Sequence, residues 1–581
     1  SAMDGIAVKA SETDGASQRR PVQLKENKQA FWVDTGDPIP EGFNAVIKVE
    51  EVNDLGGGTL EIEKAVTPWE NVRTIGESVI KGQLLLTVNH EITPYDVGAL
   101  LEAGILEIKV RKRPKVGIIP TGSEIVVPET TPEKGQHIEF NSAMMKSAAR
   151  GWGAKINVSE IVDDDYHRLK EKLLTKISNN DITVIIAGSS AGQEDYTLKL
   201  IQELGQVIVH GINIMPGKPV ILGVIEDKPV LGIPGYPLSA LLDFQIFVRS
   251  LVYEFLGLTK PDRDQTRARV KRKVPSHIGL EEYLRVNLAQ IDGDLIAVPR
   301  GRGSAAMESL LNADGVMPVS QQKEGLSPGD QNRVYLLKPR ARLEKDLLFL
   351  GSHDLSLDIL RNMIRQRNPD FSLNIQSVGS MAGLMALKRS ECHLAGAHLL
   401  DSETGQYNLP FIRKYLGDKQ MALITLVYRQ QGLMVKPGNP LGLKKIEDLT
   451  KAGITFINRQ RGAGTRILLD YWLAKQNLSP QQITGYQREE YTHIGAAAAV
   501  TNGSADTALG ILAAARAMDL DFIPLVEERY DLMMPLSYLN DKRIRLLQEI
   551  ISSHDFQKQV ESLGGYRTDD SGQVIKVNGD N

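Results

Sequence analysis

The chain has 581 residues, of which 42% are hydrophobic and 24% are charged, and its formal net charge is −4. This length exceeds what one hydrophobic core supports and predicts several domains, while the near balance of charge argues against a nucleic-acid-binding groove. No apolar run reaches the length of a membrane-spanning helix, and the single cysteine, Cys392, excludes an internal disulfide and fits a reducing, cytoplasmic location. Because the sequence starts at Ser1 and enters a motif at once, we expect N-terminal sequence to be missing.

The order of apolar patterns predicts four domains. Residues 1–110 form an N-terminal and linker region, with a β-rich unit over 1–82 and helical spacing over 83–110. Alternating strands and helices over 111–260, including one long amphipathic helix over 240–256, predict an α/β domain. A β domain follows over 261–341, and a second α/β pattern occupies 342–570 after a charged linker at 338–346. The polar residues after 570 are expected to be frayed.

Four glycine-rich loops that follow apolar runs carry most of the functional information in the first half. At the carboxyl edge of an open α/β sheet, the N–H groups of such loops suit an anion, phosphate above all. Together with one lysine and several carboxylates, they predict a phosphate- or oxyanion-handling site with a metal. The loops are Pro120-Thr121-Gly122-Ser123-Glu124, Ala187-Gly188-Ser189-Ser190-Ala191-Gly192-Gln193-Glu194-Asp195, Met215-Pro216-Gly217-Lys218-Pro219 and Ile233-Pro234-Gly235-Tyr236-Pro237.

Several polar residues of this region have both a functional and a structural interpretation. Carboxylates in Gly/Ser turns suit Mg²⁺, which takes one or two of them plus phosphate oxygens, but each alone could be a turn or cap residue. Lys218, set between Gly217 and Pro219, can be aimed at an anion or can be a surface lysine. Thr35 can donate a hydroxyl or cap a turn. The carboxylates concerned are Asp4, Glu124, Asp164 and Asp195.

Over roughly residues 1–340 the motifs and their order resemble the MoeA/gephyrin family of molybdopterin molybdenumtransferases. The resemblance implies a three-layer α/β/α molybdopterin-binding domain flanked by a β-rich insert and a β-barrel-like domain. The motifs that carry it are the four loops, Ser1-Ala2-Met3-Asp4-Gly5, Thr35-Gly36-Asp37-Pro38-Ile39-Pro40-Glu41-Gly42, Asn71-Val72-Arg73 with Gly76-Glu77, and Asn141 before a helix.

This resemblance also implies an enzyme that, with Mg²⁺, inserts molybdate into adenylylated molybdopterin and releases AMP. The working unit would be a homodimer whose cleft lies between subunits, with neither nucleic acid nor membrane as partner. Asp164 and Asp195 would be the Mg²⁺ ligands. The catalytic positions that match are Asp4, Thr35, Glu124, Asp164 and Asp195, and the cofactor-binding ones are Arg73, Gly188, Ser189, Ser190, Gly217, Lys218, Pro234, Pro237, Arg285 and Ser304.

The chain departs from this family's usual pattern at four places. The Ser-Gly-Gly loop is Ala187-Gly188-Ser189, and Met215 and Tyr236 replace a lysine and an asparagine. Ser78 stands where an aspartate is expected. The departures leave open a tungsten-handling or slow enzyme, or a non-catalytic molybdate or tungstate sensor or scaffold. A nucleotide-binding dehydrogenase is disfavoured, since no Gly-x-Gly-x-x-Gly follows a first strand.

In the second α/β pattern, three strand-to-helix junctions place Ser352, Ser380 and Thr465 at or near helix starts. Helix N-termini with hydroxyls suit a dehydrated oxyanion, although each junction alone could be ordinary N-capping. Residues 347–565 resemble the two-lobed periplasmic-binding-protein superfamily, on the motifs at 458–466 and 486–493. Fusion to the first half makes molybdate or tungstate the expected ligand. His353-Asp354 and the 489–493 segment fit no strong metal motif and are interpreted as structural or ligand-orienting.

Overall fold

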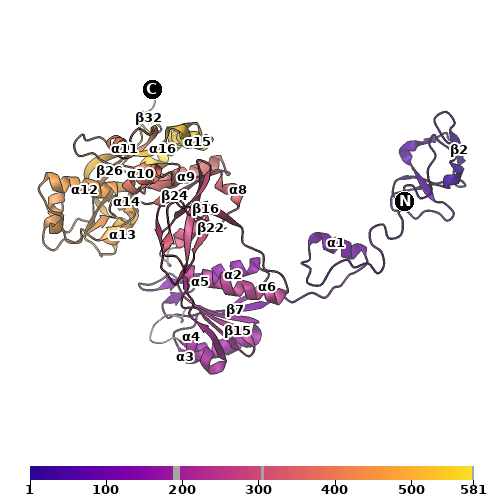
Figure 1. The fold of residues 1–581 in the computed structure, drawn as a ribbon, viewed down its shortest axis with the longest axis horizontal. Coiled ribbons are helices and arrows are strands. Elements are labelled where there is room, and N and C mark those ends of the chain that lie inside the picture. Colours follow the sequence, from indigo (N-terminus) through magenta and orange to yellow (C-terminus); the bar gives the residue numbers. More distant parts are fainter. Residues whose placement is uncertain (187–195, 303–306, 579–581) are drawn as a thin grey trace. The chain divides into compact units, whose positions relative to one another are not determined.

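The computed structural model describes residues 1–186, 196–302 and 307–578. The chain divides into two compact units, residues 1–112 with 256–258, and residues 113–255 with 259–581 (Figure 1). Within the described residues no helix is long and apolar enough to cross a membrane. The multidomain α/β architecture predicted from the sequence is confirmed.

The first unit consists of two small antiparallel sheets that enclose one core. In one sheet the central strand is β1, and in the other it is β6. Apolar residues from both sheets, among them Ile6, Ile47 and Leu60, are fully buried in this core. The helical prediction for 83–110 is correct only for α1 (Pro94–Glu102), which Gly104 at φ +73° terminates. The strands are β1 (Gly5–Val8), β2 (Val22–Lys25), β3 (Ala30–Val33), β4 (Ala45–Lys48), β5 (Val52–Asp54) and β6 (Thr59–Ile62).

The second unit begins with a three-layer domain around a six-stranded sheet of order β10-β7-β11-β15-β14-β12. Helices α3 and α4 cover one face and α2, α5 and α6 the other (Figure 1). The strands are β7 (Lys115–Pro120), β10 (Lys155–Val158), β11 (Ile182–Ile186), β12 (Gln206–His210), β14 (Ile221–Ile225) and β15 (Lys228–Ile233), and the helices α2 (Asn141–Gly151), α3 (Tyr166–Asn179), α4 (Tyr196–Leu204), α5 (Pro237–Asp243) and α6 (Arg249–Leu256).

The predicted long helix over 240–256 differs from the structure in two ways. It starts at Pro237, whose fixed φ suits a first helical turn, and a π-helical turn (Phe244–Val248) separates α5 from α6. The helix therefore follows the fourth glycine-rich loop without a gap, so its first turn adjoins the predicted anion site.

A β-barrel follows, in which pairing of β18 with both β19 and β20 closes the ring β18-β19-β16-β22-β20. Strand β13 (Ile214–Met215) joins this barrel from the third glycine-rich loop by pairing with β18. The barrel strands are β16 (Gln265–Arg269), β18 (Glu281–Ile291), β19 (Asp294–Pro299), β20 (Gly315–Val319) and β22 (Gln331–Leu336), with the β17 (Val274–Pro275) and β21 (Gly325–Leu326) pair and helix α7 (Met307–Leu311) beside them.

The C-terminal part has two lobes joined by two long antiparallel strands, β26 (Met421–Val435) and β30 (Asp521–Pro535). Helices α9, α10, α11, α15 and α16 belong to the first lobe and α12, α13 and α14 to the second (Figure 1). The first lobe contains β23 (Asp346–Gly351), α9 (Ser356–Arg367), β24 (Ser372–Ser377), α10 (Ser380–Lys388), β25 (Ala395–Ala397), α11 (Leu409–Leu416), α15 (Lys542–Ile551), α16 (His554–Ser562), β31 (Tyr566–Arg567) and β32 (Val574–Val577), and the second β27 (Phe456–Arg459), α12 (Gly464–Lys475), β28 (Glu489–Glu490), α13 (His493–Thr501), β29 (Thr507–Ile511) and α14 (Leu512–Ala517).

Two expectations for the C-terminal half are wrong. The charged segment 338–346 is not a free linker: it forms helix α8 (Arg340–Leu343), whose Leu343 is buried in the barrel core. The residues after 570 are not all frayed, because β32 pairs with β26 and Val577 is buried. Both segments are polar in composition, but each is ordered by an apolar residue, Leu343 or Val577, that packs into a core formed by distant strands.

The first lobe is packed against the barrel through a polar and an apolar contact. Buried Asp314 of the barrel pairs with Lys338 (2.5 Å) and accepts a hydrogen bond from Nδ2 of Asn374 on β24 (3.1 Å). Beside it, residues of β18 and β19 share a hydrophobic cluster with Leu348 and Leu350 of β23. The barrel and the first lobe therefore share one core.

Candidate functional site

In the first unit, Asp4 and Thr35 are in direct contact. The backbone N–H and the hydroxyl of Thr35 both donate to Oδ1 of Asp4, each over 2.6 Å. These hydrogen bonds lower the pKa of Asp4, first through the hydroxyl and then through the backbone. The two predicted residues thus present an ionised carboxylate at the surface. Arg73 is exposed, and Asn71 of its motif is fixed nearby because its carbonyl accepts from Ala2 N (2.8 Å).

In the second unit, the sheet directs its glycine-rich loops to one edge. Strands β7, β11 and β15 are parallel, and their last residues, Pro120, Ile186 and Ile233, are in register. Strand β12 runs in the same direction, because both it and β15 are antiparallel to β14. The loops after all four strands therefore start from the carboxyl edge, as predicted. The residues predicted in the second loop, Gly188, Ser189, Ser190 and Asp195, lie outside the described part of the chain.

Asp164 and the first loop are joined at this edge. The N–H of Ser123 donates to Oδ2 of Asp164 (3.4 Å), and Ser123 Oγ accepts from the Asp164 N–H (3.3 Å). Asp164 and neighbouring Glu124 both lie at the solvent-exposed side of the loop. The described residues contain no group of three potential metal-binding side chains. Two hard carboxylates beside an anion site nevertheless suit Mg²⁺, which takes its other oxygens from phosphate and water.

The third and fourth loops present Lys218 to solvent above a buried carboxyl group. Gly217 has φ +112°, and a Cβ there would lie 2.3 Å from Oδ1 of Asp243 on α5. Both carboxyl oxygens of Asp243 are buried and have no hydrogen-bond partner among the described residues, and burial raises the pKa of Asp243 to about 8. In the fourth loop, Asn141 Nδ2 donates to the carbonyl of Gly235 (2.8 Å). Buried Pro234 and Pro237 flank that exposed turn and stiffen it.

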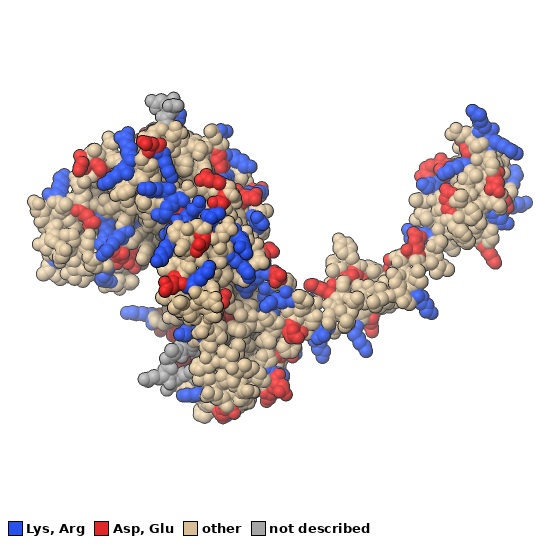
Figure 2. Space-filling view, in the orientation of Figure 1, with Lys and Arg blue, Asp and Glu red and all other residues tan. Residues whose placement is uncertain are grey.

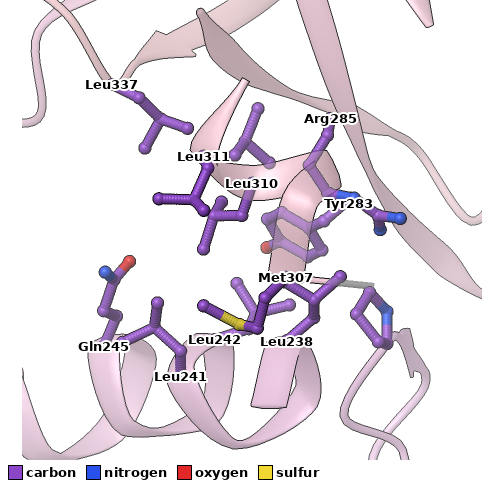
Figure 3. A pocket seen from close by; sticks show the side chains of 12 residues that line it. Leu238, Leu241, Leu242, Gln245, Tyr283, Arg285, Met307, Leu310, Leu311 and Leu337 are labelled. Atoms are coloured by element: carbon purple, nitrogen blue, oxygen red, sulfur yellow. The ribbon is translucent and has the colours of Figure 1, made fainter. Parts of the chain in front are cut away.

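Arg285 lies deeper than a phosphate-binding residue at a sheet edge would. It is 5% exposed on β18, its Nε donates to Ser309 Oγ (3.2 Å), and burial lowers its pKa. With Tyr283 it lines an apolar pocket of about 220 Å³ between α5 and α7, into which Leu241 and Leu310 point (Figure 3). The pocket supplies apolar surface rather than anion contacts. Ser304 lies outside the described residues.

In the C-terminal part, the three predicted hydroxyls lie where the lobes meet. Ser352 follows β23, Ser380 begins α10 and Thr465 lies in the first turn of α12, and all three are buried. Each is engaged in a hydrogen bond: Ser352 Oγ with His398 Nε2 (2.9 Å), Ser380 Oγ with the His398 N–H (3.4 Å), and Thr465 Oγ1 with Gln431 Nε2 (3.1 Å). The predicted junctions therefore converge.

A buried ionic network connects these hydroxyls to the interlobe strands. Arg429 of β26 binds Glu528 of β30 (2.6 Å) and Asp354 (2.5 Å). Glu528 also accepts from His398 Nδ1 (2.8 Å), so Ser352, His398 and Glu528 form a hydroxyl–imidazole–carboxylate chain. All members are at most 1% exposed. Because Glu528 is already paired with Arg429, this chain fixes the imidazole rather than activating the serine.

Three models of one family match successive segments of the first part of the chain. The MoeA N-terminal region (domain I and II) matches residues 1–104, a probable molybdopterin binding domain 117–254, and the MoeA C-terminal region (domain IV) 267–337. A putative molybdopterin biosynthesis protein of Methanocaldococcus jannaschii is 35% identical over 356 residues, which cover 58% of this chain and 85% of that protein. The chain belongs to the MoeA family.

Beyond the MoeA region, a PBP superfamily domain model matches residues 361–552. The uncharacterized protein YvgK of Bacillus subtilis is 34% identical over 228 residues, covering 39% of this chain and 73% of YvgK. A solved MoeA structure from Pyrococcus horikosii is 34% identical, with a TM-score of 0.49 over 58% of this chain and 87% of that one. This MoeA-family chain therefore carries a second module of a different superfamily.

Sequence reasoning missed the residues at the centre of the interlobe network and beneath the MoeA loops. Arg429 and Gln431 interrupt the apolar strand β26, and that polar interruption was a visible signal. Glu528, His398 and Asp243 gave no signal, because their importance depends on partners far away in the chain.

Proposed function

We propose that the chain catalyses molybdenum cofactor biosynthesis as a molybdopterin molybdenumtransferase, inserting molybdate into adenylylated molybdopterin with release of AMP. The observation that carries the proposal is the convergence of the described glycine-rich loops, Lys218 and Asp164 on one sheet edge in a MoeA-family chain. Relatives with the printed name molybdopterin molybdenumtransferase include one from Haemophilus influenzae, which is 32% identical over 267 residues, 44% of this chain and 66% of that protein.

In this proposal the exposed edge binds the substrate's phosphates. Lys218 and the loop N–H groups neutralise and orient the phosphates, and the Asn141–Gly235 hydrogen bond fixes the neighbouring turn. Mg²⁺ would be held by Asp164 and by Asp195, with Glu124 nearby, and would supply charge neutralisation at the phosphoanhydride. The pterin-binding roles of Arg73, Arg285 and Ser304 belong to the same proposal.

Asp4 and Thr35 belong to the first unit, whereas Lys218 and Asp164 belong to the second. We propose a homodimer in which the first unit of one copy completes the cleft of the other. Mixing an Asp4→Ala chain with a Lys218→Ala chain should then restore AMP release to about a quarter of the parent activity. Half of the dimers would be mixed, and each mixed dimer would retain one intact cleft of its two. Two inactive chains that stay inactive after unfolding and refolding together would contradict a shared cleft.

The direct test measures AMP release from adenylylated molybdopterin and molybdate by the full chain. Asp164→Asn should lower the rate by at least about 100-fold, since it would weaken binding of the Mg²⁺ that stabilises the phosphoanhydride charge, and losing one such electrostatic stabilisation commonly costs that much. Asp163→Asn is the matched control, because Asp163 is the preceding carboxylate and pairs with Arg168 on the surface. Equal activity of the two variants would exclude the role proposed for Asp164.

For the C-terminal module we propose capture or sensing of an oxyanion, molybdate or tungstate. The support is the convergence of Ser380, Thr465 and three helix starts between two lobes. Two residues support the alternative, which is a non-catalytic sensor or scaffold. Met215 and Tyr236 place uncharged side chains inside two of the edge loops, and Tyr236 is 62% exposed. Oxyanion binding without any AMP release by the parent chain would favour that alternative.

A further inference from the structure

Buried polar atoms without hydrogen-bond partners gather where the two C-terminal lobes meet. In the part of the chain that the structure describes, they belong to side chains from both lobes and from the interlobe strands. Buried donors and acceptors of native proteins are nearly always paired, so such a concentration indicates a missing partner. The unpaired atoms are Nδ1 of His353, Nη2 of Arg429, Oε1 of Gln431, Nη1 of Arg459, both amide atoms of Gln460 and both ring nitrogens of His493.

These side chains surround one region rather than lie scattered. His493, at the start of α13, has its pKa lowered well below the ordinary value by burial and then by Arg459, Arg429, His398 and His353 in that order. Those four residues come from the end of β27, the middle of β26, and the segments after β25 and β23. A charged group shifts the pKa of another group by this kind of interaction only when the two groups lie near each other. His493, Arg459, Arg429 and His353, which all carry unpaired nitrogens, are therefore neighbours that different elements bring together.

The charges of this centre are unevenly matched. Arg429 has two carboxylate partners, Asp354 and Glu528. Arg459 is 1% exposed and, among the described residues, its guanidinium donates only to the backbone carbonyls of Glu490 (3.2 Å) and Tyr491 (2.9 Å). On the surface, charges of both signs are interspersed (Figure 2). Burying a guanidinium without a counterion, in contrast, costs free energy of folding. An anion bound at Arg459 would remove that cost.

The two carboxylates of the centre already accept several hydrogen bonds from the protein. Asp354 accepts from Arg429, Ser356 and Tyr566, and Glu528 accepts from Arg429, Gln431 and His398. With Nδ1 of His398 donating to Glu528, its Nε2 accepts from the hydroxyl of Ser352, which leaves that hydroxyl no proton for a ligand. Arg429, Arg459 and the amide nitrogen of Gln460 offer unpaired donors, whereas the amide oxygens of Gln431 and Gln460 are acceptors, so a ligand rich in acceptor oxygens fits better than one that carries several O–H groups.

We propose that Arg459, His493 and Gln460, together with Arg429 and His353, form the binding site of the C-terminal module, and that the site takes a fully deprotonated, doubly charged tetrahedral oxyanion. The proposal rests on the proposed function for the statement that this module binds an oxyanion. Donors that approach from several elements match four oxygens better than the two coplanar oxygens of a carboxylate. Ser352 becomes a positioning residue for His398, whereas Ser380 and Thr465 keep hydroxyl protons that can be donated to the ligand.

Calorimetric titration of the full-length chain tests the site, in a Lys218→Ala background that removes the proposed anion contact of the MoeA region. Molybdate, tungstate, sulfate and phosphate are titrated separately. We expect the first three to bind at least about tenfold more tightly than phosphate, which carries a proton at neutral pH. Arg459→Gln should weaken molybdate binding at least about 30-fold, the usual effect of removing one partner of a buried charged hydrogen bond. Arg461→Gln, the matched control at a side chain 78% exposed, should change it by less than about threefold.

Three results would overturn the proposal: retained affinity in Arg459→Gln, phosphate binding as tightly as molybdate, or no binding of any of the four anions. Thermal unfolding without ligand separates a binding role from a structural one. Because the Arg459 guanidinium forms no salt bridge with any described residue, Arg459→Gln should unfold at or above the parent temperature, and a clear decrease would show that Arg459 is structural. AMP release is measured on the chain with Lys218 intact and on its Arg459→Gln variant. If the chain releases AMP but binds none of the four anions, the site is wrong and the transferase proposal stands, whereas anion binding that is lost in Arg459→Gln, without any AMP release, supports the site and contradicts the transferase proposal.

Discussion

Thr35 donates twice to the same oxygen of Asp4, from its backbone and from its hydroxyl, over two distances of 2.6 Å. The hydroxyl therefore donates within the protein, to a carboxylate 31 residues away in the chain. It holds an exposed carboxylate in one rotamer and in its charged form.

The first prediction concerns this pair. Thr35→Val keeps the backbone hydrogen bond but removes the hydroxyl, which is the larger of the two causes that lower the pKa of Asp4. We expect AMP release to fall about tenfold and its acid limb to move to higher pH, as one lost charged hydrogen bond would cause. Thr35→Ser should retain both the rate and the pH profile of the parent. Rate–pH profiles of the three chains provide the measurement, and unchanged profiles would show that Thr35 does not act through Asp4.

The second prediction concerns the unpaired carboxyl group beneath Gly217. Burial raises the pKa of Asp243 to about 8 from its ordinary value of 3.8. The native chain therefore binds this proton over a range in which the unfolded chain has released it, so the stabilisation is complete below about pH 4 and is lost as pH rises to about 8. Asp243→Asn should remove this dependence and raise the unfolding temperature at about pH 8.5 but not at about pH 5. The exposed Asp262→Asn serves as the control, and a parent chain equally stable at both pH values would contradict the prediction.

The third prediction is the pH dependence of anion binding by the C-terminal module. Burial is the largest cause that lowers the pKa values of both His353 and His493, and the nearby arginines lower them further. The negative charge of a bound dianion favours the protonated form of both imidazoles, so protons are taken up on binding and affinity rises as pH falls. Between about pH 8 and pH 6, sulfate affinity should rise by up to about tenfold per unit for each proton taken up.

Titrations in buffers of different ionisation enthalpy measure this proton uptake directly. His493→Gln should reduce the number of protons taken up, whereas His554→Gln, at an exposed histidine on α16, should not. Affinity that is independent of pH in the parent chain would contradict the prediction.

The fourth prediction concerns the contact between the barrel and the first lobe. Asp314 is fully buried and is bound by Lys338, Asn287, Leu288 N–H and Asn374. Asp314→Ala leaves Lys338 and these donors without a partner and should cost about 3–5 kcal/mol of stability. Limited proteolysis should then cut within 338–346, where the parent resists. Asp292→Ala, at a turn of the same barrel, is the control, and equal resistance of all three chains would show that the contact is dispensable.

The sequence predicted the fold where patterns are local. Apolar runs that end in glycine loops identified β7, β11 and β15 and their common edge, because strand periodicity and turn residues are read over a few positions. It failed for Leu343 and Val577, which lie in polar segments but reach cores made by distant strands. The same reason hid Glu528, whose partner Arg429 is 99 residues away, and Asp243, whose environment is set by Gly217 in another loop.

The two strands that join the C-terminal lobes, β26 and β30, pair irregularly near Arg429. Their pairing shifts register between Thr425 and Val427 and again between Gln431 and Gly432, on either side of the stretch that contains Arg429. Irregular pairing of this kind is where a sheet bends most easily. If the proposed anion leaves by opening of the lobes, its dissociation cannot be faster than bending of β26 and β30 at these points. The lifetime of the complex would then depend on the flexibility of these two strands as well as on the hydrogen bonds that hold the anion.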